Sequence, residues 1–341
     1  MSAKHADLLS AAHEAAALAS MVCRAVQSRL DEVRSIAKDD KSPVTVADFA
    51  SQAVVAHVLR ERLGKIWLVG EEAAEMLRSP AHESHRQAAL QAVRLAWPDA
   101  DEDAMLEAID VGAAHGQPGA SDSFWTLDPI DGTKGFLRGE QYAVSLAFIE
   151  HGRPVVAALG CPNLSLDFGR DFGDADPRGS LYLAMLGYGV QQGPADDPRA
   201  EMTTMVRPVR EATALIRACE SVESAHTDQS ASSRILDHAG GAGEPARLDS
   251  QCKYAVVARG QADAYLRLPT KKGYVEKIWD HAAGALVATE AGAVVTDIDG
   301  QPLDFGCGSG LAKNRGIVCA DAAVHARLVA AIADLKVGAP S

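Results

Sequence analysis

WTLDPIDGT, residues 125–133, is the stretch of the sequence that decides how the chain is interpreted. Its first three residues are typical of a short strand, which we expect to end at Asp128-Pro129. Pro129 fixes the backbone and Gly132 permits a sharp bend, so the carboxylates of Asp128 and Asp131 can face one point. Such a pair suits a hard divalent cation like Mg²⁺, although Asp-Pro-x-Asp-Gly alone is also an ordinary turn sequence.

Three further acidic positions share this context, because each lies where an apolar strand ends or a helix begins. They are Asp48, Glu71-Glu72 and Asp280. Taken singly, Asp48 and Asp280 could be helix caps, and Glu71-Glu72 could be a solvated loop. Their combination with the 125–133 stretch favours a site for metal cations.

The charge balance limits the classes of ligand. The 341 residues include 33 Lys and Arg against 46 Asp and Glu, which gives a formal net charge of −13. A chain this acidic is a poor candidate for binding a nucleic-acid polymer, since such binding depends on Lys and Arg contacts to phosphates. A small anionic ligand remains compatible with it, provided that cations or a few basic residues act locally.

The six cysteines lie far apart, without a CxxC motif or a Cys/His cluster, which argues against a zinc site. We predict reduced thiols and a cytoplasmic location, because a chain of this size without a secretory signal is typical of the cytosol. No apolar run reaches the roughly 20 residues that a membrane span needs, so no membrane association is expected. A redox-switched enzyme stays possible on the cysteine count alone.

Hydrophobic periodicity predicts helices over residues 6–30 and from residues 46–48 to 63, the second with one apolar side. A strand over 66–69 and a hairpin of 143–149 with 155–159 follow, with a polar, helix-prone insertion over 79–120. In the second half we expect strands over 214–216, 262–266, 294–296 and 317–319, a helix over 280–291 and a final helix. Gly, Pro and Asp crowd residues 187–200, so we predict an α+β domain over 1–200 and an α/β domain over 201–341.

The order of the acidic motifs resembles that of a known superfamily. Asp48, then Glu71, then Asp128-Pro-Ile-Asp131-Gly-Thr133, then Trp279-Asp280 is similar to the pattern of the lithium-sensitive, Mg²⁺-dependent phosphatases that include inositol monophosphatase and fructose 1,6-bisphosphatase. The resemblance extends over nearly the whole chain. It implies a layered αβαβα sandwich of mixed α+β and α/β character.

Within that superfamily, the chain most resembles the 3'(2'),5'-bisphosphate nucleotidases of the eukaryotic type. The segments that carry the likeness are 41–48 (KSPVTVAD), 128–142 (DPIDGTKGFLRGEQY), 160–164 (GCPNL), 249–254 (DSQCKY) and 276–281 (EKIWDH). One departure is Ala73, where relatives often have Ser or Asp. It puts only a contact beside the metal ligands in doubt.

The resemblance implies the following roles in the site. Glu71, Asp128, Asp131 and Asp280, with the backbone carbonyl of Ile130, are expected to bind two or three Mg²⁺ ions. Asp48 and the Thr133 hydroxyl are expected to take the proton from the attacking water. The backbone N–H groups of Gly132 and Thr133 are expected to face the phosphate.

The substrate-binding set is expected to come from the second half of the chain. Lys253 and Arg267 are candidates for holding a second phosphate, because Arg grips phosphate in a bidentate manner and Lys acts as a point charge; both could also be plain surface charges. Ser250 is expected to bind the nucleotide. Glu223 and His226 are expected near the sugar and phosphate, although His226 could equally be a surface or capping histidine.

The implied activity is removal of the 3'-phosphate from 3'-phosphoadenosine 5'-phosphate by a monomeric, lithium-sensitive enzyme, with 3'-phosphoadenosine 5'-phosphosulfate as a second substrate. Two alternatives remain at this point. One is an inositol polyphosphate 1-phosphatase of the same fold. The other is a catalytically silent nucleotide-binding regulator, against which the complete carboxylate set argues.

Overall fold

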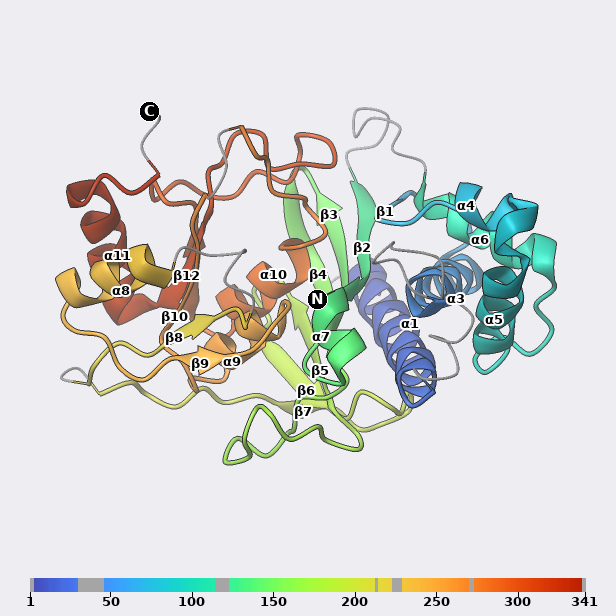
Figure 1. The fold of residues 1–341 in the computed structure, drawn as a ribbon, viewed down its shortest axis with the longest axis horizontal. Helices are drawn as coiled ribbons and strands as arrows, with labels where there is room; N and C mark the ends of the chain where they lie inside the picture. Colours follow the sequence, from blue (N-terminus) through green and yellow to red (C-terminus); the bar gives the residue numbers. More distant parts are fainter. Residues whose placement is uncertain are drawn as a thin grey trace.

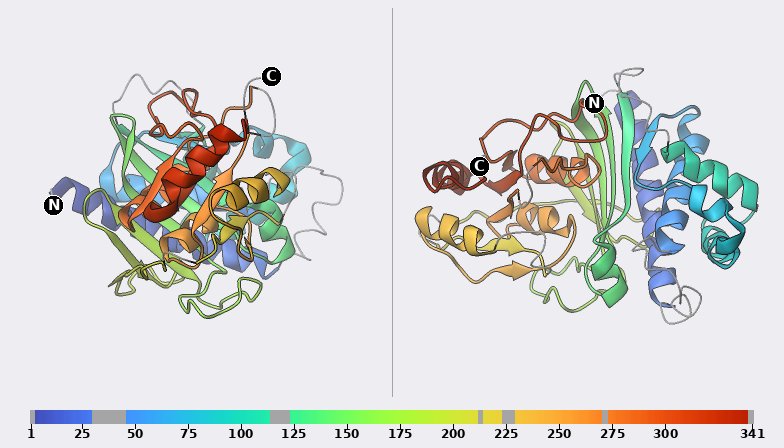
Figure 2. Two further views of the ribbon diagram at one scale, coloured as in Figure 1. Left: turned by 90° about the vertical axis from the view of Figure 1, so that its left-hand side faces the viewer. Right: turned by 45° about the horizontal axis from the view of Figure 1, so that its top comes forward.

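The computed structural model describes residues 3–29, 46–113, 123–211, 214–222, 229–269 and 273–338. Two sheets and three layers of helices alternate through the molecule (Figure 1). Helices α1 and α3 lie on one face of the first sheet, α9 and α10 lie between the sheets, and α8 and α11 lie outside the second sheet (Figure 2). The αβαβα sandwich implied by the resemblance is confirmed.

The first sheet has the order β1-β2-β3-β4-β5-β6-β7. Only β1 and β2 are parallel, and each of the other neighbouring pairs is antiparallel. Its strands are β1 (Leu68–Gly70), β2 (Ser123–Asp131), β3 (Ala143–Glu150), β4 (Arg153–Cys161), β5 (Ser180–Met185), β6 (Val190–Gly193) and β7 (Thr203–Thr204). The predicted hairpin of β3 and β4 is confirmed, and its turn residues His151 and Gly152 both have positive φ, as a tight turn matched to strand twist requires.

The second sheet has the order β11-β12-β10-β8-β9. Its strands are β8 (Ala218–Glu220), β9 (Ala246–Arg247), β10 (Ala264–Arg267), β11 (Ala293–Thr296) and β12 (Ile317–Asp321). The prediction of a strand over 214–216 is wrong, because the strand begins at Ala218 and Ile216 makes only an isolated bridge to Ala242. The first sheet extends through residues 187–200 to Thr204, so the division at residue 200 stays a prediction.

The helices are α1 (Ala3–Gln27), α3 (Val46–Leu63), α4 (Glu75–Arg78), α5 (Glu83–Val93), α6 (Glu102–Gly112), α7 (Thr133–Arg138), α8 (Gln229–His238), α9 (Cys252–Ala258), α10 (Ala282–Glu290) and α11 (Ala322–Asp334), with a 3₁₀ turn at Pro80–His82. The residues predicted for the apolar side of α3 are buried, except the half-buried Leu63, but burial in the first part of the helix is not confined to that side. Every residue from Val46 to Ala56 is buried, because α1, β2, α5 and α6 surround this helix. A helix enclosed in this way buries side chains on all sides, and here these include the polar Asp48, Ser51 and Gln52.

Strand β2 does not end at Asp128-Pro129 as predicted. It continues to Asp131, and its pairing with β3 shifts register between Asp128 and Asp131, which face Ser145 and Ala143. Three steps along β2 thus match two along β3, which defines a bulge. Residues three apart in a regular strand point to opposite faces, so the extra residue lets both carboxylates point to the same side.

Among the described helices, none is long and apolar enough to cross a membrane. All six cysteines are free, as predicted, and five of them are buried.

Candidate active site

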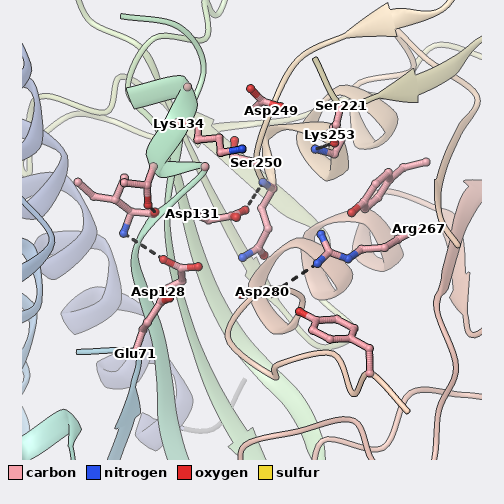
Figure 3. Close-up of a pocket in the computed structure, with 17 residues that line it drawn as sticks. Glu71, Asp128, Asp131, Lys134, Ser221, Asp249, Ser250, Lys253, Arg267 and Asp280 are labelled. Atoms are coloured by element: carbon pink, nitrogen blue, oxygen red, sulfur yellow. Dashed lines mark hydrogen bonds and ion pairs between the residues drawn. The ribbon is translucent and has the colours of Figure 1, made fainter. Parts of the chain in front are cut away.

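A cleft of about 290 Å³ lies between the first sheet and the elements of the second half (Figure 3). It brings together residues that lie up to about 200 positions apart in the sequence. Its walls are Glu71, Asp128, Ile130, Asp131, Gly132, Thr133, Lys134, Gly135, Ser221, Asp249, Ser250, Gln251, Lys253, Tyr265, Arg267, Tyr274 and Asp280. Every predicted metal ligand lines this cleft.

The strand pairing explains how three of the carboxylates meet. Gly70 of β1 pairs with Leu127 of the parallel strand β2, so the next residues, Glu71 and Asp128, emerge side by side at the same end. The bulge in β2 then adds Asp131. Asp280 comes from the second half, where the carbonyl of the preceding Trp279 accepts hydrogen bonds from Ser145 Oγ (3.1 Å) and Gln251 Nε2 (2.8 Å).

The carboxylates are too close together, and too far removed from solvent, to ionise independently. Burial raises the pKa of Asp128 well above its usual range, and the charges of Glu71, Asp131, Asp280 and Asp48 raise it further. Burial also raises the pKa of Asp280 well above its usual range, and the charge of Asp131 raises it further. Sites of this kind need a counter-charge to hold their carboxylates ionised, and all-oxygen donors suit Mg²⁺. The donor set therefore fits bound divalent cations.

Asp48 lies in the first turn of α3 and is buried. Its charge acts on both Asp128 and Glu72, so it belongs to the same acidic group. Ser51, one turn further along, donates to the carbonyl of Pro129 (3.0 Å) and attaches α3 to the 125–133 stretch. The Thr133 hydroxyl donates to the Ile130 carbonyl (3.3 Å). The pairing of Asp48 with Thr133 stays a prediction.

Gln52 is a site-building residue that the sequence reasoning missed. Its Nε2 donates to the carbonyls of Glu72 (2.7 Å) and Ile109 (2.8 Å), while its Oε1 accepts from the N–H of Glu72 (3.1 Å). These bonds fix the turn that presents Glu71. Burial, Asp48 and Glu71 raise the pKa of Glu72 to about 8. The available signal was an amide side chain next to the apolar run of residues 53–56 in this helix.

Lys253 is not the plain surface charge that remained possible from the sequence. It is 4 % exposed, and its Nζ donates to Ser221 Oγ (3.2 Å) and to the Leu248 carbonyl (3.4 Å). The ammonium also lies 5.3 Å from the centre of the Tyr265 ring. Burial lowers the pKa of Lys253, although neighbouring carboxylates oppose the shift.

Arg267, at the end of β10, lines the cleft opposite the carboxylates of β1 and β2 (Figure 3). Its Nε pairs with Glu276 Oε2 (2.8 Å), and its Nη2 lies 3.9 Å from Asp280 Oδ2. A guanidinium has five N–H donors, so these contacts orient the group and leave donors for a ligand.

A second residue cluster lies behind Asp280 and was not predicted. Side-chain atoms of Glu276, Asp280 and His281 lie within 4.8 Å of one another. Glu276 pairs with Arg267, and His281 bridges Glu276 (3.3 Å) and the Tyr254 hydroxyl (2.9 Å). Although burial alone would raise the pKa of Glu276, its bond to His281 and the charge of Arg267 lower it to about 2. We interpret the cluster as an ion-pair network that fixes Asp280.

The predicted binding residues Gly132 and Ser250 lie against each other. Both have positive φ, 87° and 68°, and a Cβ added to Gly132 would lie 2.8 Å from Ser250 Cβ. Glycine is therefore required at position 132. Gly132 precedes α7, which begins at Thr133. The prediction that the N–H groups of Gly132 and Thr133 face the phosphate requires a helix that begins there. Glu223 and His226, and residues 41–45 of the motif before Asp48, lie outside the described residues.

Comparison with known proteins identifies the family of the chain. The model of the inositol monophosphatase family matches residues 4–336. The chain is 41% identical to the 3'(2'),5'-bisphosphate nucleotidase of Schizosaccharomyces pombe over 88% of this chain and 86% of the relative. It is 39% identical to the 3'(2'),5'-bisphosphate nucleotidase of Oryza sativa over 97% of this chain and 94% of the relative.

Solved structures share the fold at lower identity. A bacterial member of the inositol monophosphatase family from Bacteroides thetaiotaomicron aligns with a TM-score of 0.60 at 21% identity, covering 92% of this chain and 96% of that one. An inositol monophosphatase from Anabaena aligns with a TM-score of 0.58 at 20% identity, covering 97% and 95%. The chain belongs to the inositol monophosphatase family and, within it, to the group of the 3'(2'),5'-bisphosphate nucleotidases.

Proposed function

We propose that this chain is a Mg²⁺-dependent 3'(2'),5'-bisphosphate nucleotidase that converts 3'-phosphoadenosine 5'-phosphate to AMP and phosphate. The inositol monophosphatase family consists of metal-dependent phosphatases. The observation that carries the substrate proposal is the cleft itself, where an acidic wall faces the buried Lys253 and the partly exposed Arg267. One wall suits metal cations and the reacting phosphate, and the other suits a second anionic group.

In this proposal Glu71, Asp128, Asp131, Asp280 and the Ile130 carbonyl hold two or three Mg²⁺ ions. Bound divalent cations supply Lewis acidity and lower the pKa of a coordinated water. The chain's own part is to orient the substrate and move a proton. The buried carboxylate of Asp48, with the Thr133 hydroxyl, accepts the proton of the attacking water.

The remaining contacts position the substrate. The N–H groups of Gly132 and Thr133, at the start of α7, face the reacting phosphate. Ser250, Lys253 and Arg267 hold the nucleotide and the phosphate that is not cleaved, with Glu223 and His226 near the sugar. The formal net charge of −13 supports a small-molecule substrate over a nucleic-acid polymer. The monomeric state and the cytoplasmic location remain predictions from the sequence.

A substrate panel tests the proposal. Phosphate release is measured with Mg²⁺ on 3'-phosphoadenosine 5'-phosphate, its sulfated form, inositol 1-phosphate and inositol 1,4-bisphosphate. We expect kcat/KM to be highest for 3'-phosphoadenosine 5'-phosphate. Lys253 and Arg267 offer cationic contacts to its second phosphate, which inositol 1-phosphate lacks, and Ser250 contacts its nucleotide, which inositol 1,4-bisphosphate lacks. A preference for inositol 1,4-bisphosphate would assign the chain to the inositol polyphosphate phosphatases instead. No turnover of any of the four would support a silent regulator.

Arg267→Ala is expected to lower kcat/KM for 3'-phosphoadenosine 5'-phosphate by roughly tenfold to a hundredfold, since a hydrogen bond to a charged group contributes about 1.5–3 kcal/mol. A substrate with a single phosphate should lose far less. Arg267→Lys should recover only part of the loss, because Lys lacks the planar fork.

Thermal unfolding of the Arg267 variants must be recorded alongside, since Glu276 loses its ion-pair partner. Arg247→Ala is the matched control, because Arg247 is exposed on β9 outside the cleft and pairs with Glu220. Equal losses on the two kinds of substrate would place Arg267 in the general scaffold of the site.

A further inference from the structure

The loop at residues 249–251 is attached to the β2–α7 segment at three successive points. The N–H of Gln251 donates to Asp131 Oδ2, and Gly132 packs against Ser250. Further out, Arg138 at the end of α7 donates through Nη2 to Asp249 Oδ2. The first two contacts involve residues already assigned to the site. The third, between Arg138 and Asp249, has no role in the proposed chemistry.

Asp249 connects three segments of the cleft wall. Its side chain is 8% exposed, and its two oxygens have different partners. Oδ2 pairs with Arg138 on α7, whereas Oδ1 accepts from the N–H of Val222 (3.2 Å), just beyond β8. A buried carboxylate without its cation is strongly unfavourable, so the ion pair holds α7, the 249–251 loop and residues 221–222 in one arrangement.

The neighbours of these contacts are the residues that face the nucleotide in the proposed function. Ser250 follows Asp249 and has a φ of 68°, a conformation that a non-glycine residue keeps only when its surroundings hold it. Ser221 precedes Val222 and accepts a hydrogen bond from Lys253 Nζ (3.2 Å). Asp249, Ser250 and Lys253 accordingly lie together on one rim of the cleft (Figure 3).

We infer that Arg138 and Asp249 form a positioning pair that holds Ser250 and Lys253 in place for the part of the substrate that is not cleaved. The inference rests on the proposed function, because the proposed function assigns the binding of the nucleotide to Ser250 and Lys253. Neither side chain belongs to the proposed metal ligands. Loss of the pair therefore weakens substrate binding more than it slows the chemical step.

The test compares Arg138→Gln, Asp249→Asn and the double variant on 3'-phosphoadenosine 5'-phosphate. Asn at position 249 keeps an oxygen for the Val222 N–H, but it removes the charge and replaces the oxygen that accepts from Arg138 by an NH2 group. Each single variant is expected to raise KM about five- to twentyfold with kcat within about threefold of the parent. The dissociation constant of the product AMP should rise by a similar factor. The double variant should be no worse than the poorer single variant, because both changes remove one interaction.

Two controls separate this role from general stability. Glu140 is another ion-pair partner of Arg138, with its Oε2 2.6 Å from Arg138 Nε. Glu140→Gln removes the charge of this partner and should leave KM unchanged. Arg138→Lys keeps the charge and should recover part of the affinity. Thermal unfolding of all variants shows whether they fold.

Several results would overturn the inference. They are additive effects in the double variant, equal losses of kcat on bisphosphorylated and monophosphorylated substrates, or reduced thermal stability with unchanged KM and AMP affinity. A change confined to Asp249→Asn would mean that Asp249 contacts the substrate by itself. If instead the parent protein neither hydrolyses 3'-phosphoadenosine 5'-phosphate nor binds AMP, the proposed function is what fails.

Discussion

Asp131→Asn and Asp280→Asn are each expected to lower kcat by about a thousandfold or more, because each removes a charge that holds the cations stabilising the transition state. The fold should survive. Asparagine has the same shape as aspartate, and its side-chain oxygen can still accept the hydrogen bond that Asp131 receives from Gln251. Burial raises the pKa of both carboxyl groups, so neither charge stabilises the cation-free protein.

The measurement is kcat at saturating Mg²⁺, together with the thermal midpoint of unfolding. Asp171→Asn is a matched control, since Asp171 is an exposed loop residue outside this cleft. Turnover within about threefold of the parent, a difference of less than 1 kcal/mol, would show that the residue in question is not a metal ligand.

Removal of divalent cations is expected to reduce phosphate release to background, and added Mg²⁺ should restore it. The clustered carboxylates, combined with the lack of a Cys/His motif, suit a hard cation rather than zinc. Mg²⁺ should also raise the thermal midpoint, because a ligand that binds only the folded protein stabilises it. Li⁺ should inhibit, as the family resemblance implies.

This experiment has a readout that is independent of turnover. If Asp131→Asn abolishes the Mg²⁺-dependent rise of the thermal midpoint, the loss of activity and the loss of metal binding have one cause. Full activity of the parent protein in excess chelator would contradict the proposed cofactor.

The carboxylates that meet in the cleft could be found from the sequence because they stand in short, contiguous motifs. Glu71 follows a short apolar strand, and Asp128 and Asp131 lie three residues apart. Periodicity could not reveal the bulge in β2, since it depends on pairing with β3. A local pattern of Asp, Pro and Gly therefore indicated a strand end where the strand continues.

The contacts between distant segments could not be predicted from the sequence for a related reason. Gln52, Asp249 and Arg138 are defined by partners 20 to 111 positions away. Nothing in the local pattern of such residues distinguishes them from ordinary polar ones. At residues 214–216 the local pattern predicted a strand that the structure does not contain. A short apolar run can pair or remain irregular, depending on its tertiary neighbours.

The distribution of the site over two sheets has a consequence for how this enzyme could diversify. Glu71 directly follows β1, and Asp128 and Asp131 lie in β2. Ser250, Lys253 and Arg267 come from the loop before α9, from α9 and from β10. Most residues of the proposed hydrolytic chemistry and those that select the ligand are thus encoded in separate stretches of the gene, with Asp280 as the one proposed metal ligand from the second half. Variation in the second stretch can retune which phosphorylated compounds are accepted while the reaction itself is inherited unchanged. Exchanging residues 246–269 with those of a relative of different substrate range is a direct way to observe such retuning.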